Sequence, residues 1–342
     1  MSAFRNRSLV AAAAFAMALT MTACGSSSSS SSGAATAAAS GSAAGGEAPA
    51  AGGDYTIGVS VADQKSLFYI AAVDGMNKAA ADAGVNLVVL SADNNSNQQV
   101  NQVNDLITQQ VDALIFIAQD ATAAAAGVKA ANKANIPVIA VDQKPESGEG
   151  ELATYIATDS VKAADELCTW VFEQMGGSGE IGILQGVLGS TAELQRSQGC
   201  QQALDKNPNI TVVAKESANW DETEGYKAAQ NMLQANPNIK AIIGESDAMG
   251  LGAAKAAKDD GKDIIAVGID GFPTMISAIK EGLTEATQAQ VPYKMGQFAV
   301  ADSIKILSDQ EVPPLQYQDT VLVTSENVST VNPEDFYGPN VK

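Results

Sequence analysis

The sequence predicts an α/β protein with two doubly wound lobes, each built on a parallel sheet that helices cover on both faces. Short apolar runs alternate with segments of helical period from residue 55 to residue 324. Unbroken apolar strands separated by helices are typical of parallel sheets that are buried on both faces. About 289 residues follow residue 53, which is enough for two ordinary domains. One large sheet is the alternative, but the number of strands favours two.

The first series of elements covers residues 55–141 and predicts one lobe. A strand at 55–61 leads into a helix at 68–83. The inward face of that helix carries Phe68, Ala71, Ala72, Gly75, Met76 and Ala79. A second helix should point Val100, Val103 and Ile107 inward. Further strands are expected at 85–90, 112–117 and 136–141.

The second series covers residues 152–324 and repeats the alternation. Its strands are expected at 152–157, 180–185, 210–216, 239–244, 264–269, 283–289 and 319–324. Its helices are expected at 160–175, 190–206, 222–235, 247–260, 273–281 and 293–308.

Residues 1–23 are interpreted as a lipoprotein signal peptide. Two arginines precede an apolar core at 9–19, which is too short to span a bilayer but suits a signal peptide. The segment MTAC (21–24) then resembles the bacterial lipobox, with Met21 in place of the usual leucine. Two acyl chains on Cys24 would anchor the protein stably at a membrane. A secretory signal with an incidental cysteine is the alternative.

Residues 24–53 follow as a Ser/Ala/Gly tether, which we expect to be disordered. Removal of residues 1–23 takes away two of the 20 basic residues and none of the 39 acidic ones. Nucleic acid and anionic lipid surfaces attract positive charge, so neither is an expected partner of this acidic chain. No second apolar run of ~18 residues follows Cys24, and we expect membrane attachment through the lipid anchor alone.

The sequence contains no histidine. This removes the commonest general base, the commonest zinc ligand and every Ser-His-Asp or Cys-His arrangement. Neither a P-loop nor a G-x-G-x-x-G motif follows a strand. Paired carboxylates such as Asp259 and Asp260 lie in a polar stretch that closes a helix, where solvated charge is the better interpretation. The sequence therefore gives no indication of an enzyme active site, a cofactor or a metal site, and we expect none of the three.

Three segments together resemble the ribose-binding-protein-like (type I) periplasmic sugar-binding proteins. They are ANIPVIAVDQ (134–143), LQGVLGSTAELQRSQG (184–199) and VGIDGFPTMISAIKEG (267–282). The resemblance implies two lobes joined by three crossing strands, a monosaccharide bound in the cleft and delivery to the permease of a sugar ABC transporter. Regulators of the lac-repressor type share this fold. Here, however, a lipid signal and a serine tether stand where their DNA-binding segment would be.

The resemblance also sets the expected lobe boundaries. The N-terminal lobe would comprise 54–157 plus 291–324, and the C-terminal lobe 158–290 plus 325–342. The crossing segments are expected near 156–159, 288–293 and 323–326.

Four polar residues stand at or just beyond the ends of predicted strands, where ligands bind in open α/β sheets. They are Asp142, Asp270, Gln290 and, slightly further from its strand, Gln119. Carboxylates accept strong hydrogen bonds from hydroxyl groups, and amides both donate and accept. These side chains suit a ligand rich in hydroxyl groups.

The resemblance assigns further residues to the ligand site. The matching positions are the aromatic pair Phe68 and Tyr69, the cleft aromatic Trp220, Asp142, Asp270, Gln290 and Ser246, which stands where asparagine is usual. Each position has a structural alternative. The aspartates could be strand-end turn residues, the aromatic pair core, the tryptophan a surface or hinge residue, and Gln119 a plain loop residue.

Two arginines of the family's site are missing in this assignment. Gln143 follows Asp142 where an arginine is expected, and Leu194 takes the second position. Arg196 matches a position that does not contact ligand in the family. Near the end of the third strand, the family has an asparagine that this sequence replaces with Ile117, Ala118 and Gln119. With both aspartates kept and two bidentate donors lost, we expect a neutral hexose, pentose or sugar alcohol. Ribose itself and anionic sugars are disfavoured, and the ligand's less polar edge should lie near Leu194 and Trp220.

Cys168 and Cys200 remain in the folded body. An exported chain meets an oxidising environment, in which an even pair commonly bridges. The two cysteines lie on the helices at 160–175 and 190–206, which right-handed crossovers place side by side. We expect a disulfide that stiffens the second lobe, with two buried free thiols as the alternative.

The expected protein is a monomeric, extracytoplasmic, lipid-anchored solute-binding protein of an ABC transporter. A sensor that presents its sugar to a membrane receptor is the alternative, because the residues of a binding cleft do not distinguish the two.

Overall fold

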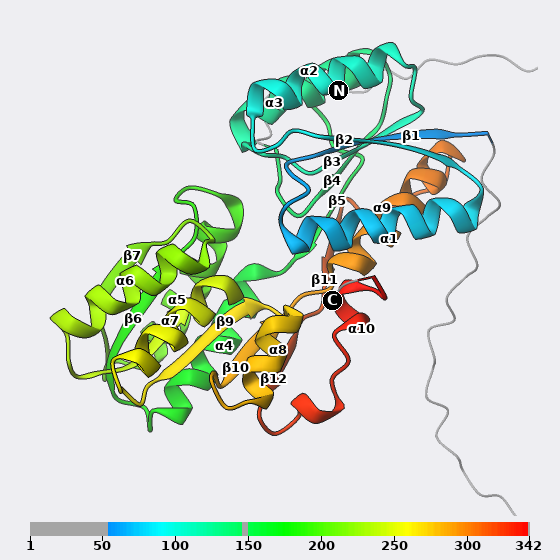
Figure 1. Ribbon diagram of the computed structural model, residues 1–342. Coiled ribbons are helices and arrows are strands. Elements are labelled where there is room, and N and C mark those ends of the chain that lie inside the picture. The colour runs from blue at the N-terminus through cyan, green and yellow to red at the C-terminus, as the bar shows by residue number, and fades with distance from the viewer. Residues whose placement is uncertain (1–53, 146–149, 341–342) are drawn as a thin grey trace, which may run out of the picture. The chain divides into compact units, whose positions relative to one another are not determined.

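The computed structural model describes residues 54–145 and 150–340, in which two six-stranded sheets are each flanked by helices (Figure 1). This arrangement confirms the predicted α/β fold with two sheets. The predicted signal peptide at 1–23, the lipidated Cys24 and the tether at 24–53 lie outside the described residues. Among the helices that the structure describes, none is long and apolar enough to cross a membrane.

The first lobe is a parallel sheet with strand order β11-β5-β4-β3-β1-β2. Its strands are β1 (Thr56–Val61), β2 (Asn86–Ser91), β3 (Ala113–Phe116), β4 (Val138–Val141), β5 (Thr154–Thr158) and β11 (Leu315–Gln318). Helices α1 (Leu67–Ala83) and α9 (Pro292–Leu307) cover one face, and α2 (Ser96–Thr108) and α3 (Ala121–Lys133) cover the other (Figure 1). An apolar cluster fills the space between the sheet and each pair of helices.

Glycines allow α1 and α9 to pack closely. A Cβ on Gly296 of α9 would lie 1.9 Å from the carbonyl oxygen of Ala72, and a Cβ on Gly75 of α1 would lie 2.0 Å from that of Tyr293. No side chain fits at such distances, so the two helices meet backbone to backbone. The contact fixes α1, whose first turn carries Phe68 and Tyr69.

The second lobe has strand order β12-β10-β9-β8-β6-β7, parallel except that β12 runs antiparallel to β10. Its strands are β6 (Gly179–Gln185), β7 (Ile210–Ser217), β8 (Ile239–Gly244), β9 (Ile265–Asp270), β10 (Ala286–Ala289) and β12 (Val321–Thr324). Its helices are α4 (Ser160–Gln174), α5 (Thr191–Lys206), α6 (Glu222–Ala235), α7 (Asp247–Asp259) and α8 (Pro273–Lys280). Apolar clusters lie between the sheet and α4 with α5, and between the sheet and α6 with α7.

The end of the chain differs from the predicted lobe boundaries. Strand β12 pairs with β10, so residues 321–324 belong to the second lobe and not to the first. The third crossing therefore lies between β11 and β12, at 319–320 instead of 323–326. Strand β11 escapes sequence analysis because its sequence, LQYQ, has only four residues and follows two prolines, and its apolar side chains are exposed at the sheet edge.

Two smaller expectations also need correction. Residues 325–340 do not belong to the second lobe alone, because η1 (Val328–Thr330) packs on α8 whereas α10 (Glu334–Tyr337) packs on α9 and α1 of the first lobe. In α2, Val100 and Ile107 are only half-buried, and Leu106 is fully buried beside Val103. The inward row of α2 is thus rotated from the predicted one.

A disulfide joins Cys168 of α4 to Cys200 of α5, with the two Cα atoms 5.4 Å apart. Both cysteines are buried within the apolar cluster between these helices and the sheet. Gly199 allows the approach, because a Cβ there would lie 2.1 Å from the carbonyl oxygen of Val161. The bridge fastens the helix that also carries Arg196.

Candidate ligand-binding site

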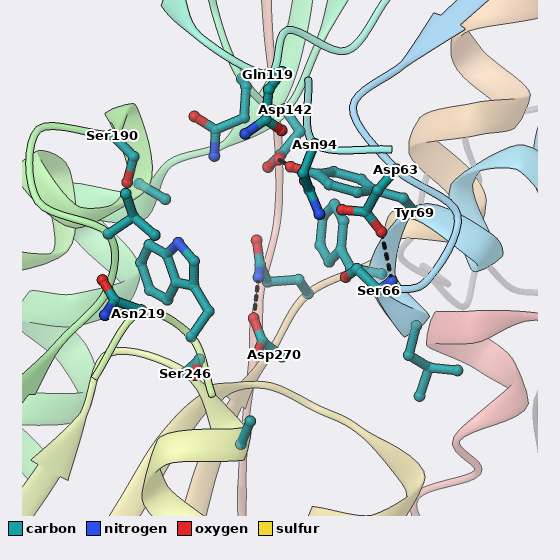
Figure 2. A pocket seen from close by; sticks show the side chains of 18 of the residues that line it. Asp63, Ser66, Tyr69, Asn94, Gln119, Asp142, Ser190, Asn219, Ser246 and Asp270 are labelled. Atoms are coloured by element: carbon teal, nitrogen blue, oxygen red, sulfur yellow. Dashed lines mark hydrogen bonds between the residues drawn. The ribbon is translucent and has the colours of Figure 1, made fainter. Parts of the chain in front are cut away.

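A cavity of about 570 Å³ is lined by residues of both lobes. Most of these residues follow the carboxyl ends of strands, which is where ligands bind in open α/β sheets. In Figure 2, Asn94, Gln119 and Asp142 lie on one side of the cavity, with Ser246 and Asp270 opposite. The lining combines carboxylates, amides, hydroxyl groups and aromatic rings with a single guanidinium among the described residues.

Asp142 directly follows β4 and has a left-handed backbone, with φ of 58°. Its Oδ2 accepts a hydrogen bond from the hydroxyl group of Tyr69 at 3.2 Å, and its carbonyl oxygen accepts one from Tyr155 at 2.6 Å. The rings of Phe68 and Tyr69 form a T-shaped contact with 5.7 Å between their centroids. Burial raises the pKa of Asp142, and the charge of Arg196 opposes that rise.

The remaining first-lobe wall includes residues that sequence analysis misses, namely Asp63, Ser66 and Asn94. Asp63 is buried, and its Oδ1 accepts from the backbone N–H groups of Lys65 and Ser66 at 2.7 and 2.8 Å. These two hydrogen bonds form a turn that leads into α1. Aspartate side chains make such turns in many loops that bind nothing. Nothing in the sequence separates this turn from those.

Gln119 lines the cavity because a buried amide fixes the backbone after β3. The side chain of Gln99 on α2 donates to the carbonyl oxygen of Ile117 and accepts from the N–H of Gln119, both at 2.8 Å. Gln143 lines the cavity beside Asp142. Both amides therefore face the space in which a ligand would lie.

Asp270 ends β9 and is fixed by several neighbours. Its Oδ1 accepts from the side-chain amide of Gln290 at 2.8 Å, and its Oδ2 accepts from the N–H of Asp247 at 3.2 Å. Arg196 Nη1 lies 3.6 Å from Oδ1. Burial raises the pKa of Asp270, and the nearby Arg196 charge opposes that rise. Thr158 donates to Gln290 Oε1 at 2.7 Å, so the end of β5 also supports this pair.

The assignment of Leu194 to the site is wrong, and Arg196 takes its place. Leu194 is 57% exposed and does not line the cavity, whereas Arg196 is 5% exposed and does. The inward row of α5 comprises Glu193, Arg196, Gly199, Cys200 and Ala203. Leu194 lies two residues before Arg196, which places it on the opposite side of a helix with 3.6 residues per turn. Arg196, Gly199 and Cys200 are spaced three and four residues apart, which places them on one face of the helix. This spacing is the signal that could have identified Arg196 as inward-facing.

Arg196 is held by a hydrogen bond and by an aromatic ring. Its Nη1 donates to the carbonyl oxygen of Glu245, and its guanidinium lies 5.5 Å from the ring centroid of Trp220. Its Nε is buried and has no hydrogen-bond partner among the described residues. A cation over an indole ring is favourable, whereas a buried N–H group without a hydrogen-bond partner costs free energy.

Trp220 lies over the cavity on a strained backbone. Trp220 and Asn219 have φ of 65° and 50°, a conformation that bulky side chains rarely adopt. A Cβ on Gly186, the residue after β6, would lie 2.0 Å from the Trp220 ring. Glycine at 186 is therefore what allows the indole to lie flat there, and backbone strain of this kind gathers at binding sites.

A second layer of carboxylates supports Arg196 and the loop after β6. Glu245 accepts from the N–H of Gly186 at 2.9 Å and from the hydroxyl group of Ser197 at 2.7 Å. Glu193 accepts from the side-chain amide of Gln185 at 2.6 Å. Burial raises the pKa of Glu245 to about 7. Ser246, which caps α7 by accepting from the N–H of Met249, lies beside this layer and lines the cavity.

The structure brings nine of the ten predicted ligand positions to one cavity. They are Phe68, Tyr69, Gln119, Asp142, Gln143, Trp220, Ser246, Asp270 and Gln290. The cavity further contains Phe272, Ser190 and Val187, which sequence analysis does not single out. Within the part of the chain that the structure describes, no group of three or more His, Cys, Asp or Glu side chains could bind a metal ion.

Comparison with known proteins agrees with this architecture. The periplasmic binding protein domain model matches residues 57–311. The ribose import binding protein of Bacillus subtilis is 34% identical over 259 residues, which cover 76% of this chain and 84% of that protein. The chain belongs to the type I periplasmic sugar-binding proteins. These relatives are binding proteins, and the chain is accordingly a binding protein and not an enzyme.

Further members of this family bind a range of small molecules. The xylitol-binding protein of Mycolicibacterium smegmatis is 34% identical over 288 residues, which cover 83% of this chain and 81% of that protein. A solute-binding protein from Mycobacterium smegmatis, solved with glycerol bound, has a TM-score of 0.78 and 29% identity over 84% of this chain and all of that chain. The fructose-binding periplasmic domain of a hybrid two-component system has a TM-score of 0.75 and 27% identity over 81% of this chain and 92% of that domain.

Proposed function

We propose that this protein binds a neutral monosaccharide or sugar alcohol in the cavity between Asp142 and Asp270. The observation that carries the proposal is the composition of the lining, in which carboxylate acceptors, amides and flat aromatic rings face one space of about 570 Å³. A hydroxyl-rich ligand offers many donors and acceptors along its edges and C–H groups on its faces.

Each wall would supply a different part of the recognition. Asp142 and Asp270 would accept from ligand hydroxyl groups, and charge-assisted bonds of this kind are about twice as strong as neutral ones. The guanidinium group of Arg196, which lines the cavity, would donate to a ligand oxygen. Phe68 and Trp220 would stack against the C–H faces of the ligand.

The charges in the cavity oppose an anionic ligand. Three aspartates, Asp63, Asp142 and Asp270, line it together with one arginine. Arg196 lies 3.6 Å from Asp270 and is therefore already compensated. A phosphate or carboxylate group would lie among carboxylates that burial leaves poorly screened, which costs free energy.

The relatives support the transport role. They include a ribose import binding protein and a xylitol-binding protein. We infer that this chain delivers its ligand to the permease of an ABC transporter as an extracytoplasmic monomer, anchored at the membrane through lipidated Cys24. The lipobox-like segment at 21–24 supports the anchor. A sensor role is the second candidate, because one structural relative is the periplasmic domain of a two-component system.

Titration calorimetry tests the proposal with matched neutral and anionic probes. The neutral probes are ribose, xylitol, D-allose and myo-inositol, and the anionic counterparts are ribose 5-phosphate and myo-inositol 1-phosphate. We expect at least one neutral probe, or a sugar identified by mass spectrometry in the purified protein, to bind. The phosphorylated counterpart should bind at least roughly 100-fold more weakly, as repulsion of about 3 kcal/mol implies. Equal binding of both, or binding of no neutral sugar or polyol, would overturn the proposal.

A further inference from the structure

The C-terminal segment 325–340 reaches the ligand site, although it lies beyond the residues 57–311 that the family model matches. After β12 of the second lobe, η1 packs on α8. The chain then continues to α10, which packs on α9 and α1 of the first lobe (Figure 1). The segment therefore contacts helices of both lobes.

Tyr337 of α10 is fully buried, and its hydroxyl group donates to the carbonyl oxygen of Asp270 at 2.9 Å. The same carbonyl oxygen accepts from the backbone N–H of Gln290 at 2.9 Å. The side chain of Gln290 in turn donates to the carboxylate of Asp270 at 2.8 Å. A residue of the tail thus completes the hydrogen bonding of the two polar residues on which this wall of the cavity depends.

The position of Tyr337 is fixed by its ring contact and by the turn that follows it. The ring packs edge-on against Phe272, which lines the cavity, with 5.5 Å between ring centroids. The next residue, Gly338, has φ of 77°, and a Cβ there would lie 2.3 Å from the ring of Tyr293 on α9. Only glycine allows the chain to turn this closely over that ring. The hydroxyl group of Tyr337 therefore has little freedom to move away from Asp270.

We propose that Tyr337 is a positioning residue, through which the C-terminal tail sets the ligand affinity of the Asp270–Gln290 pair. The role in affinity rests on the proposed function. A buried carbonyl oxygen with two donors is fixed more firmly than one with a single donor, and Asp270 carries its carboxylate on the same residue. Loss of the tyrosine hydroxyl group lets the end of β9 relax, and the carboxylate moves with it.

Tyr337→Phe removes the hydroxyl group and keeps the ring. Tyr226→Phe is the matched control, because the Tyr226 hydroxyl group donates to the exposed Asp259 at 2.9 Å and lies outside the cavity. In ligand-free protein, we expect Tyr337→Phe to speed amide hydrogen exchange roughly 3- to 10-fold in peptides that contain Asp270–Phe272 and Gln290. Tyr226→Phe should leave both peptides unchanged.

Calorimetry with the tightest-binding neutral probe gives the second readout. Tyr337→Phe should weaken binding roughly 3- to 10-fold, and it should have no further effect in an Asp270→Ala background. Unchanged exchange and unchanged affinity in Tyr337→Phe would overturn the proposal. An equal loss of affinity with and without Asp270 would also overturn it, since the tyrosine would then act on the fold alone. Failure of the proposed function would look different. Wild-type protein would then bind no neutral probe, whereas Tyr337→Phe would still speed hydrogen exchange in the ligand-free protein.

Discussion

Asp142 and Asp270 line one cavity but are supported differently. Asp270 is fixed by the amide of Gln290, by the N–H of Asp247 and by the charge of Arg196. Asp142 accepts from the hydroxyl group of Tyr69 and lies on a left-handed backbone. The second-lobe carboxylate is therefore preorganised by a network, whereas the first-lobe carboxylate is oriented mainly by its turn and by one aromatic residue.

The first prediction concerns Arg196 and Leu194, which are two residues apart on α5. Arg196→Met should weaken binding of the neutral ligand by roughly 10-fold or more, because a charged donor is lost from the cavity. Leu194→Ala is the control and should change affinity little, because that side chain is 57% exposed and outside the cavity. Calorimetry decides between them, with melting temperatures to check folding. The opposite ranking of the two variants would restore Leu194 to the site.

The second prediction concerns Glu245, whose pKa burial raises from 4.5 to about 7. At pH values between 4.5 and about 7, the Glu245 carboxyl group holds its proton more tightly in the folded protein than in the unfolded chain. The stabilisation from the neutral carboxyl group is present at low pH and is lost as pH rises through about 7.

Glu245→Gln does not titrate, so its free energy of unfolding lacks this component. Relative to the variant, wild-type protein should lose about 3 kcal/mol between pH 4.5 and pH 8. Urea denaturation across that range measures the difference. Stability curves of wild type and variant that run parallel in pH would contradict the assigned pKa.

At the scale of secondary structure, periodicity predicts most of the fold. Helix α6 and strand β8 have the predicted bounds, 222–235 and 239–244, because apolar spacing and caps agree there. Strand β11 could not be predicted, because it has four residues and its apolar side chains are exposed. The inward side of α5 could have been predicted from the spacing of Arg196 with Cys200, but a match by resemblance alone chose the wrong residue.

The sequence also predicts those site residues that follow apolar strands, but not those that come from loops or from distant parts of the chain. Residues that directly follow apolar strands, such as Asp142 and Asp270, are located by the topology of an open sheet. Asp63 and Asn94 come from loops whose sequences read as ordinary turns. The contact of Tyr337 with Asp270 joins residues 67 positions apart, and no local pattern indicates it.

The third prediction concerns the disulfide between α4 and α5. Its cysteines are 32 positions apart, and the chain-entropy model gives a stabilisation of about 4 kcal/mol for a loop of this order. In urea denaturation, the double variant Cys168→Ala, Cys200→Ala should have a free energy of unfolding that is lower by that amount. It should still bind ligand with wild-type affinity, because neither cysteine lines the cavity. Two reactive thiols in unfolded, unreduced wild-type protein would contradict the bridge.

At the scale of the whole molecule, each lobe supplies part of the cavity, and the tail contacts helices of both. Three further connections join the lobes, after β5, after β10 and between β11 and β12. Ligand contacts from both walls would favour arrangements in which the walls approach each other, which is how hinged binding proteins close. Binding at this site is thus a property of the pair of lobes and not of either alone.

The fourth prediction concerns attachment of the whole chain to the membrane. Cys24→Ser removes the thiol that we expect to be acylated, so the protein should appear in the medium or persist as an uncleaved precursor. Cell fractionation measures the distribution, and the intact mass of wild-type protein should include the acyl chains. Cys168→Ala, Cys200→Ala is a matched control and should stay with the membrane. A Cys24→Ser protein that fractionates like wild type, together with an unmodified wild-type mass, would exclude the anchor.

The central claim is that one neutral ligand is bound by carboxylates of both lobes. Calorimetry of Asp142→Asn and Asp270→Asn with that ligand tests it most directly. The control is Asp259→Asn, an exposed aspartate outside the cavity. Each cavity variant should lose roughly 10- to 150-fold in affinity, as loss of a charge-assisted bond of about 1.5–3 kcal/mol implies, while Asp259→Asn binds like wild type. Wild-type affinity in both cavity variants, with their folds intact, would contradict the account.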